Sequence, residues 1–304
     1  MRKQCLIYHI GTGVGFYSEF NNMILCMVLA LQHGIDFTIY SRDAFFFDGK
    51  GWQKYFEPFC KEKKSRIHHY INRRVSSILH DSVKSWFADK FLIIGSSLYK
   101  LFTGNFLTQD FFFSSRSVWF QNSTFNIPQH NLQGDLLAVS NALIEKIYKF
   151  NPKYQDIIGK TISELALPDH FIGLHIRGGD KITEKDLFSI SKYMEVAENC
   201  SSCRNAFVLT DDYQIINSLK KNYLDWSFYT LTFPDECGYV NASFEAKSVE
   251  RREKEMIKVF ASVEVIRKSD LFIGTYSSNI GMFLGMLMPK DKVIALDSKE
   301  WYIL

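Results

Sequence analysis

The carboxyl-terminal half of the chain alternates between short apolar runs and segments with helical periodicity. The expected strands are 171–176, 206–210, 226–230, 271–275 and 292–296, and the expected helices are 190–198, 213–222, 248–268 and one that begins at residue 278. Strands that alternate with helices in this way predict βαβ units, in which the strands of one sheet run parallel. The fold class that follows is α/β, with a buried parallel sheet.

The amino-terminal residues show the same order of elements. A strand, a glycine-rich turn, a helix and a second strand are expected at residues 4–10, 11–15, 18–33 and 36–40. This order is typical of a Rossmann-like opening. The dinucleotide fingerprint G-x-G-x-x-G is matched imperfectly, because the third glycine is Gly15 and Phe16 fills the last position. A ligand-binding turn and a plain strand-to-helix turn both stay open.

The middle of the chain is harder to interpret. Residues 45–115 are irregular and rich in aromatic and basic side chains, and they are followed by an expected strand at 118–121, a helix at 132–150 and a crossover at 151–168. Two explanations stay open for a basic cluster in this region: a solvated helix face, or a surface that rests on anionic lipid. The cluster consists of Lys61, Lys63, Lys64, Arg66, Arg73 and Arg74, around His68 and His69.

Length and composition limit the class of protein. A chain of 304 residues suits two domains, and 46% hydrophobic residues provide for substantial cores. A net charge of +3 does not call for nucleic acid, whereas a small basic excess suits phosphorylated ligands or an anionic membrane surface. The apolar run 23–31 is too short to span a bilayer, and no secretory signal precedes it. We therefore expect a cytoplasmic protein, with the inner face of a membrane as the alternative location.

The strand expected at 171–176 ends abruptly in glycine and charge. His175 is its one polar residue. The charged residues that follow are Arg177, Asp180, Lys181 and Glu184. A guanidinium and an ammonium suit phosphate, and carboxylates can accept a proton. Because ligands bind at the carboxyl ends of strands in open α/β sheets, a ligand-binding loop is expected here, with a solvated surface turn as the alternative.

Two other expected strands also end in polar residues. Ser277 and Ser278 follow the fourth strand of this half, where the N–H groups and dipole of a helix start attract phosphate. An ordinary serine N-cap is the alternative. Asp211 and Asp212 follow the second strand, where they either cap the next helix or bind a ribose or a base edge.

These motifs resemble the α-1,6-fucosyltransferases and, more distantly, the superfamily that includes α-1,2- and protein O-fucosyltransferases. The signature His-x-Arg-Arg-x-Asp, with Lys next in the α-1,6 branch, is similar to residues 175–181, which read His-Ile-Arg-Gly-Gly-Asp-Lys. Thr-Asp-Asp at 210–212 and the stretch 269–279 also resemble the family. Gly178 departs from the pattern, since relatives have a second arginine there. Ser262 is a second departure, since relatives have an acidic residue used in nucleotide recognition.

The resemblance implies a GT-B-like α/β fold in which two Rossmann-like domains face a cleft. Residues 1–165 are then the acceptor-side domain and residues 166–304 the nucleotide-sugar-binding domain. The implied reaction is an inverting, metal-independent transfer of fucose from GDP-fucose to a hydroxyl of a glycan or glycolipid acceptor, without a cofactor. By the same resemblance Tyr17, Glu19 and Asn21 are expected to face the cleft from the helix after the glycine turn.

The resemblance also implies roles for individual residues. Arg177, Lys181 and the helix start at Ser277 are expected to stabilise the charge that develops on the leaving β-phosphate. Glu184 is the expected base for the acceptor hydroxyl, with Asp186 and Asp180 as rivals. The residues expected to bind the nucleotide sugar are His175, Arg177, Asp180, Lys181, Asp211, Asp212, Thr275, Ser277, Ser278, Asn279 and Gly13. No residue is expected to bind a metal.

Three alternative functions stay open. The first is a glycosyltransferase of the same fold that uses another nucleotide sugar. The second is a non-catalytic protein that binds a nucleotide sugar or a glycan. This alternative stays open because Gly178 stands where relatives have an arginine. The third is an NAD-dependent oxidoreductase that uses the glycine turn, against which the missing third glycine argues.

Overall fold

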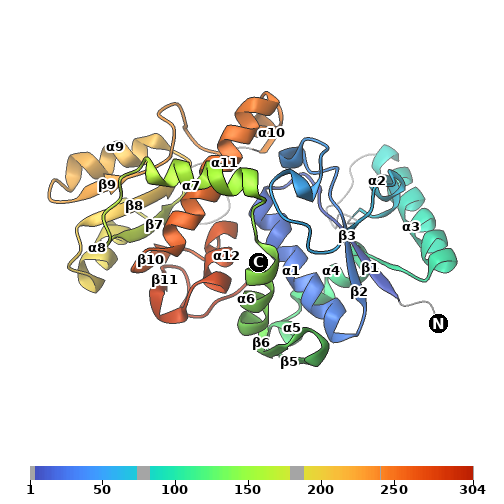
Figure 1. Cartoon of the computed structure of the whole chain (residues 1–304). Coiled ribbons are helices and arrows are strands. Elements are labelled where there is room, and N and C mark those ends of the chain that lie inside the picture. Colours follow the sequence, from blue (N-terminus) through green and yellow to red (C-terminus); the bar gives the residue numbers. More distant parts are fainter. Residues whose placement is uncertain (1–3, 74–82, 179–187, 240, 304) are drawn as a thin grey trace. The chain divides into compact units, whose positions relative to one another are not determined.

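The chain divides into two compact units, Met1–Asn151 and Pro152–Leu304 (Figure 1). The computed structural model describes residues 4–73, 83–178, 188–239 and 241–303. The boundary expected at residue 165 places helix α7 (Pro152–Ser163) in the first domain. In the structure α7 packs instead against α11 (Val249–Arg267) of the second unit, where the Tyr154 hydroxyl donates a hydrogen bond to Glu253 at 2.7 Å.

Within its described residues the second unit is built on a five-stranded parallel sheet with the order β11-β10-β7-β8-β9. The strands are β7 (Ile172–Ile176), β8 (Asn205–Thr210), β9 (Ser227–Tyr229), β10 (Leu271–Gly274) and β11 (Val293–Ala295). The chain builds outward from β7 to β9 and then returns to add β10 on the other side of β7. The strand order therefore reverses between β7 and β10.

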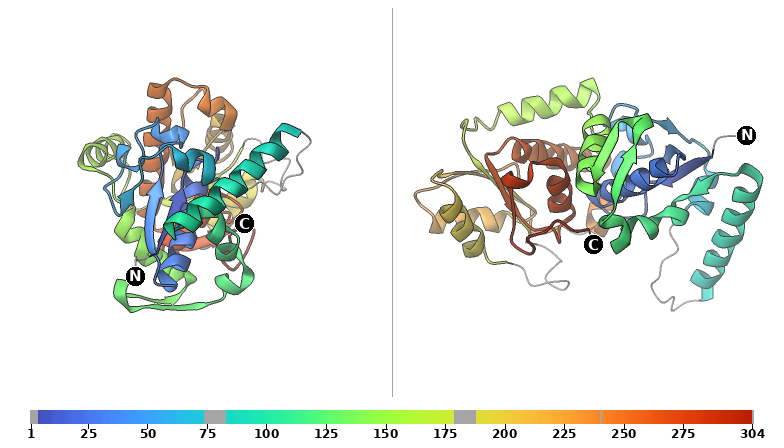
Figure 2. Two further views of the ribbon diagram at one scale, coloured as in Figure 1. Left: turned by 90° about the vertical axis from the view of Figure 1, so that its right-hand side faces the viewer. Right: turned by 90° about the horizontal axis from the view of Figure 1, so that it is seen from below.

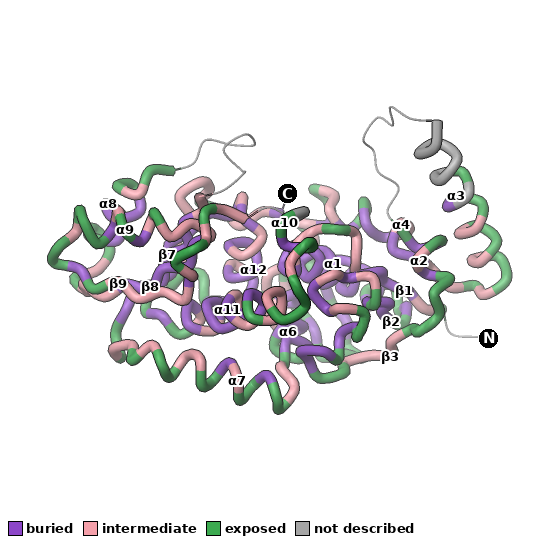
Figure 3. Tube along the Cα trace, turned by 90° about the horizontal axis from the view of Figure 1, so that it is seen from above, coloured by how far each residue is buried: buried purple, intermediate pink, exposed green. Residues whose placement is uncertain are grey.

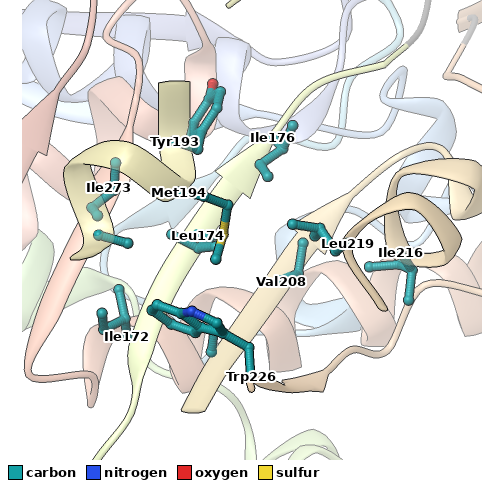
Figure 4. Packing of buried hydrophobic residues seen from close by; sticks show 12 residues of the cluster. Ile172, Leu174, Ile176, Tyr193, Met194, Val208, Ile216, Leu219, Trp226 and Ile273 are labelled. Carbon is teal, nitrogen blue, oxygen red and sulfur yellow. The ribbon is translucent and has the colours of Figure 1, made fainter. Parts of the chain in front are cut away.

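The two faces of this sheet are covered by different helices, because side chains along a strand alternate between the faces. On one face, apolar residues of β7 and β8 form a core with α8 (Ile190–Cys200) and α9 (Tyr213–Asn222) (Figure 4). On the other face, Gly173 lets α11 approach closely, since a Cβ there would lie 2.9 Å from Cγ2 of Ile266. The remaining helices of this unit are α10 (Asn241–Glu245) and α12 (Asn279–Leu287).

The first unit has a smaller parallel sheet of the order β3-β2-β1-β4 and an antiparallel pair, β5 and β6. Its strands are β1 (Cys5–His9), β2 (Asp36–Tyr40), β3 (Lys61–Glu62), β4 (Phe106–Leu107), β5 (Thr124–Ile127) and β6 (Leu132–Asp135). Its helices are α1 (Phe16–Gln32), α2 (Ile67–Ile71), α3 (Val83–Thr103), α4 (Thr108–Phe112), α5 (Val118–Gln121) and α6 (Leu136–Ile147).

Helix α1 is the centre of the first unit. It is buried on nearly all sides, as expected from residues 23–31, which are apolar all round. Aromatic rings pack against it: Phe16 stacks on Phe56 with ring centroids 5.3 Å apart, and Phe56 stacks on Trp52 at 4.6 Å. A large part of the aromatic content of the chain therefore serves this core.

Three expectations about the middle of the chain are wrong. Residues 118–121 form helix α5 instead of a strand, because the Ser117 hydroxyl accepts a hydrogen bond from the Phe120 N–H at 3.2 Å and caps the turn. The helix expected from 132 starts only at Leu136, after strand β6, since Asp135 caps it. The region expected to be irregular contains α3.

Among the described helices, none is both long and apolar enough to cross a bilayer.

Candidate functional site

The carboxyl ends of β7 and β10 lie side by side, because these strands are parallel neighbours with Ile172 opposite Leu271. The order of strands reverses between them, and ligands bind at such switch points in open α/β sheets. The structure therefore brings the motif that ends in Arg177 and the motif that begins at Thr275 to one edge of the sheet.

His175 links the two motifs. Its Nδ1 lies 3.2 Å from the hydroxyl of Ser278, and the side chain is buried in β7. Burial lowers the pKa of His175 to about 3, and the positive charge of Arg177 acts in the same direction. The imidazole is therefore neutral at pH 7. Because the Ser278 hydroxyl accepts the Gly281 N–H at 3.0 Å, its own proton is available to Nδ1.

Asp211 organises the backbone that follows β7. Its carboxylate accepts the Gly178 N–H at 2.7 Å and the Tyr239 N–H at 3.3 Å. It also pairs with Arg177, with 3.5 Å between Nε and Oδ2. Both side chains are only partly exposed, so the ion pair attracts the guanidinium toward Asp211 at the end of the central strand.

Asp212 caps α9, which is one of the two roles predicted for it from the sequence. Its Oδ1 accepts the Gln214 N–H at 2.9 Å. It also explains the glycine that departs from the family signature, since a Cβ at Gly178 would lie 2.6 Å from Cβ of Asp212. A side chain at position 178 is therefore excluded unless the loop moves.

We expect Gly178→Ala to lower the free energy of unfolding by about 1–3 kcal/mol, because the added methyl group overpacks against Asp212. Urea denaturation followed by circular dichroism measures this change. The control is Gly159→Ala at an open, exposed position in α7, where alanine is expected to be neutral or stabilising. Equal stability of Gly178→Ala and the wild type would show that the loop moves freely.

Some backbone N–H groups at the start of α12 already have a hydrogen-bond partner within the protein. The Tyr276 and Ser277 N–H groups donate to the two oxygens of Asp297 at 2.9 Å and 2.7 Å. Burial raises the pKa of Asp297, but these hydrogen bonds outweigh that effect and hold the pKa below its ordinary value. Ser278 is the N-cap of the helix, as the alternative to a phosphate-binding role predicted. Two N–H groups near the expected phosphate site are therefore bound to a carboxylate of the protein.

Thr275 and Asn279 flank the serines at the start of α12. Thr275 is buried, and its carbonyl accepts the Ser278 N–H at 3.4 Å, while Asn279 is the first residue of α12. Asp297 was missed in the sequence, although an acidic residue just after the expected strand 292–296 was a usable signal. The residues Asp180, Lys181, Glu184 and Asp186 lie outside the described part of the chain.

The glycine turn of the first unit has a clear steric role. Gly11 has φ of +135°, and a Cβ there would lie 2.7 Å from the Ala44 nitrogen. Gly13 has φ of +84° with nothing within 4 Å of a Cβ, so space is open beside it. The turn is held by Glu19, which accepts the N–H groups of Gly11 and Thr12 at 3.3 Å and 2.6 Å.

The expectation that Tyr17, Glu19 and Asn21 face a cleft is wrong. All three are buried, with exposed fractions of 4%, 1% and 1%. The Tyr17 hydroxyl lies 2.8 Å from that of Tyr148, and Glu19 holds the glycine turn. Polar residues on α1 therefore support the core of this unit.

Asp43 is the hub of a second polar cluster that was not recognised in the sequence. Its Oδ2 lies 2.8 Å from Nε2 of His9 and 2.9 Å from Nδ1 of His69, and Oδ1 accepts the Tyr40 hydroxyl at 3.0 Å. Burial raises the pKa of Asp43, but these hydrogen bonds outweigh it and lower the pKa to about 2. His9 and Tyr40 end neighbouring parallel strands, which was the available signal.

Within the described ranges, no group of three or more His, Cys, Asp or Glu side chains is arranged to hold a metal ion. The arrangement at β7 and β10 offers a guanidinium, which is a group that binds phosphate, beside a neutral imidazole and serine hydroxyls that are hydrogen-bonded within the protein.

The sequence matches the family of "Alpha-(1,6)-fucosyltransferase N- and catalytic domains" over residues 136–288, a little more than half of the chain. The chain belongs to the α-1,6-fucosyltransferase family. It is thus a glycosyltransferase of the fucosyltransferase type, and the oxidoreductase alternative is removed. The residues matched include the ends of β7, β8 and β10, where the polar groups described above lie.

The fold of this α-1,6-fucosyltransferase family member is similar to that of NodZ. NodZ α-1,6-fucosyltransferase co-crystallised with GDP matches with a TM-score of 0.58 and 13% identity, over 98% of this chain and 96% of NodZ. The fucosyltransferase NodZ from Bradyrhizobium has the same TM-score and coverage at 14% identity. NodZ soaked with GDP-fucose matches with a TM-score of 0.58 at 14% identity, over 94% of each chain. The GT-B-like α/β fold is confirmed.

The search among proteins of curated function found no match. The family assignment therefore rests on the matched domain, and the similarity to NodZ adds the fold.

Proposed function

We propose that this protein transfers fucose from GDP-fucose to a hydroxyl of a glycan or glycolipid acceptor, with inversion and without a metal ion. The observation that carries the proposal is the position of Arg177, which Asp211 holds at the carboxyl end of the central strand, beside the start of α12. Support for the donor comes from NodZ, which was crystallised with GDP and soaked with GDP-fucose.

In the proposed reaction the acceptor oxygen attacks the anomeric carbon, and the bond from that carbon to the β-phosphate oxygen breaks. Negative charge then grows on the β-phosphate. Arg177 offers a planar guanidinium whose position Asp211 restrains, so little reorganisation is needed as this charge develops. A cation of the protein thus takes the place of a metal ion.

The groups around the guanidinium fit the same role. His175 is neutral, and its hydrogen bond with Ser278 connects the end of β7 to the start of α12. At the beginning of α12 both the N–H and the side chain of Ser277 are hydrogen-bonded to Asp297. We assign diphosphate binding to Arg177, Lys181 and this helix start, and donor binding to the other predicted residues of the second unit.

Deprotonation of the acceptor requires a carboxylate, and we assign this step to Glu184. The proton moves from the acceptor hydroxyl to the carboxylate as the new glycosidic bond forms. GDP leaves with the electron pair of the broken bond. We further assign donor binding to the second unit and acceptor binding to the first unit.

The donor assignment predicts a selective change in thermal stability. GDP and GDP-fucose are expected to raise the melting temperature, because a ligand that binds only the folded state at one hundred times its dissociation constant adds about 2.7 kcal/mol. UDP-, CMP- and TDP-linked sugars serve as matched controls in differential scanning fluorimetry. Preferential stabilisation by a UDP-sugar would reject GDP-fucose as the donor.

Transfer is also expected to continue in EDTA. This follows if Arg177 and Lys181 supply the charge that a divalent ion supplies in other transferases. The measurement is the rate of GDP release before and after chelation. Activity that is lost in EDTA and restored by manganese would contradict the metal-free mechanism.

A further inference from the structure

Helix α3 turns an apolar face toward solvent. Ile94, Leu98, Leu101 and Phe102 lie at helical spacing along one side of it, with exposed fractions of 57%, 50%, 78% and 81%. The opposite side carries the buried Leu92. A surface helix ordinarily places polar residues outward, so an apolar face toward solvent is unusual.

The neighbouring helix α2 extends this surface. α2 packs against α3, and a Cβ at Gly95 of α3 would lie 3.0 Å from Cγ2 of Ile71 of α2. Two more large side chains of α2 are exposed, Ile67 at 45% and Tyr70 at 69%. In the left view of Figure 2, α3 (teal) crosses the side of its unit that faces the viewer, and Figure 3 shows mostly exposed and half-buried positions along it. Contiguous exposed apolar surface of this kind marks an interaction site.

The segment that leads into α2 supplies positive charge. Lys61, Lys63, Lys64 and Arg66 are exposed, and none of them forms an ion pair with a residue in the described part of the chain. Arg73, just after α2, is exposed as well and contacts His69. The apolar helix pair is therefore flanked by cations, and the four that precede α2 have no ion-pair partner among the described residues.

We propose that α2, α3 and this basic segment form a docking surface for an anionic lipid membrane, with α3 lying in the plane of the interface. Apolar and aromatic side chains enter the boundary between headgroups and acyl chains, while lysine and arginine pair with anionic headgroups. A second copy of the chain fits less well, because two such surfaces would bring the unpaired cations of both copies together. This inference goes beyond the transfer reaction and does not depend on it.

The test is co-sedimentation of the full chain with lipid vesicles. Binding is expected to vesicles of phosphatidylcholine with phosphatidylglycerol and to fall steeply in high salt, whereas pure phosphatidylcholine vesicles retain little protein. Equal binding to both vesicle types, or no binding to either, would overturn the proposal. A dimer in sedimentation velocity would also overturn the proposal if replacing Leu101 and Phe102 with aspartate dissociated it. The apolar face would then be a contact between two copies of the chain.

Two variants separate the apolar and charged contributions. Leu101→Asp with Phe102→Asp, and separately Lys63→Glu with Lys64→Glu, are each expected to weaken vesicle binding by about tenfold or more. Leu224→Asp is the matched control, because Leu224 is 86% exposed but belongs to the second unit. All these positions are exposed, so melting temperatures are expected to match the wild type. Unchanged binding in both variants would contradict the proposed surface.

Discussion

Replacement of Arg177 with alanine is expected to lower the rate of fucose transfer by roughly a hundredfold or more. The guanidinium is the charge that we assign to the leaving β-phosphate, and Asp211 restrains it before the donor arrives. Steady-state kinetics with GDP-fucose measure the loss, and calorimetry measures the weaker binding of GDP. Arg177→Lys is expected to recover only part of the rate, because an ammonium cannot form two parallel hydrogen bonds.

The matched control for this variant is Arg204→Ala. Arg204 precedes β8 and so lies at the amino edge of the same sheet, where it pairs with Asp225 at 3.4 Å. Its loss is expected to leave the transfer rate near that of the wild type. The fold should survive Arg177→Ala, because Asp211 keeps its hydrogen bonds to Gly178 and Tyr239. Near-normal turnover in a folded Arg177→Ala variant would remove the guanidinium from the site.

Glu184→Gln is expected to reduce turnover by roughly a hundredfold or more while donor binding survives. Glutamine keeps the size and much of the hydrogen bonding of the side chain but cannot accept the acceptor proton. The measurement pairs the turnover number with the dissociation constant of GDP. A fall in turnover without a change in GDP affinity is the signature of a lost base.

Two neighbouring variants distinguish the base from the phosphate-binding groups. Asp186→Asn is expected to have a much smaller effect, whereas Lys181→Ala is expected to weaken donor binding as well as rate, because its charge acts on phosphate in both the ground and transition states. If Asp186→Asn is slow and Glu184→Gln is not, Asp186 is the base. If neither variant slows transfer, the base lies elsewhere in the chain.

The elements of the second unit were predictable because local and long-range signals agree there. α9 was expected at 213–222 and occupies Tyr213–Asn222, and Asp212 caps it. α11 begins directly after Ser248, whose hydroxyl accepts the Arg251 N–H. Caps and apolar periodicity are properties of adjacent residues, so they can be recognised in the sequence.

The first unit was less predictable because packing overrides local preference there. Residues 118–121 have the aromatic and β-branched composition of a strand, yet they form a helical turn. The apolar face of α3 points outward, so the usual relation between periodicity and burial does not reveal which side packs. The polar residues of α1 were expected to face a cleft, but they are buried. Glu19, for example, accepts hydrogen bonds from the glycine turn, which the sequence did not reveal.

The sequence by itself determined the α/β class, the family and the charged strand ends, because these depend on residue type and spacing along the chain. Only the tertiary structure decided which strand ends meet, since the return of the chain from β9 to β10 places Thr275 beside the end of β7. It also decided that Asp297 takes two N–H groups at α12 and that Asp212 leaves room only for glycine at 178. Contacts of this kind join residues far apart in the chain, and their geometry exists only once the sheet has formed.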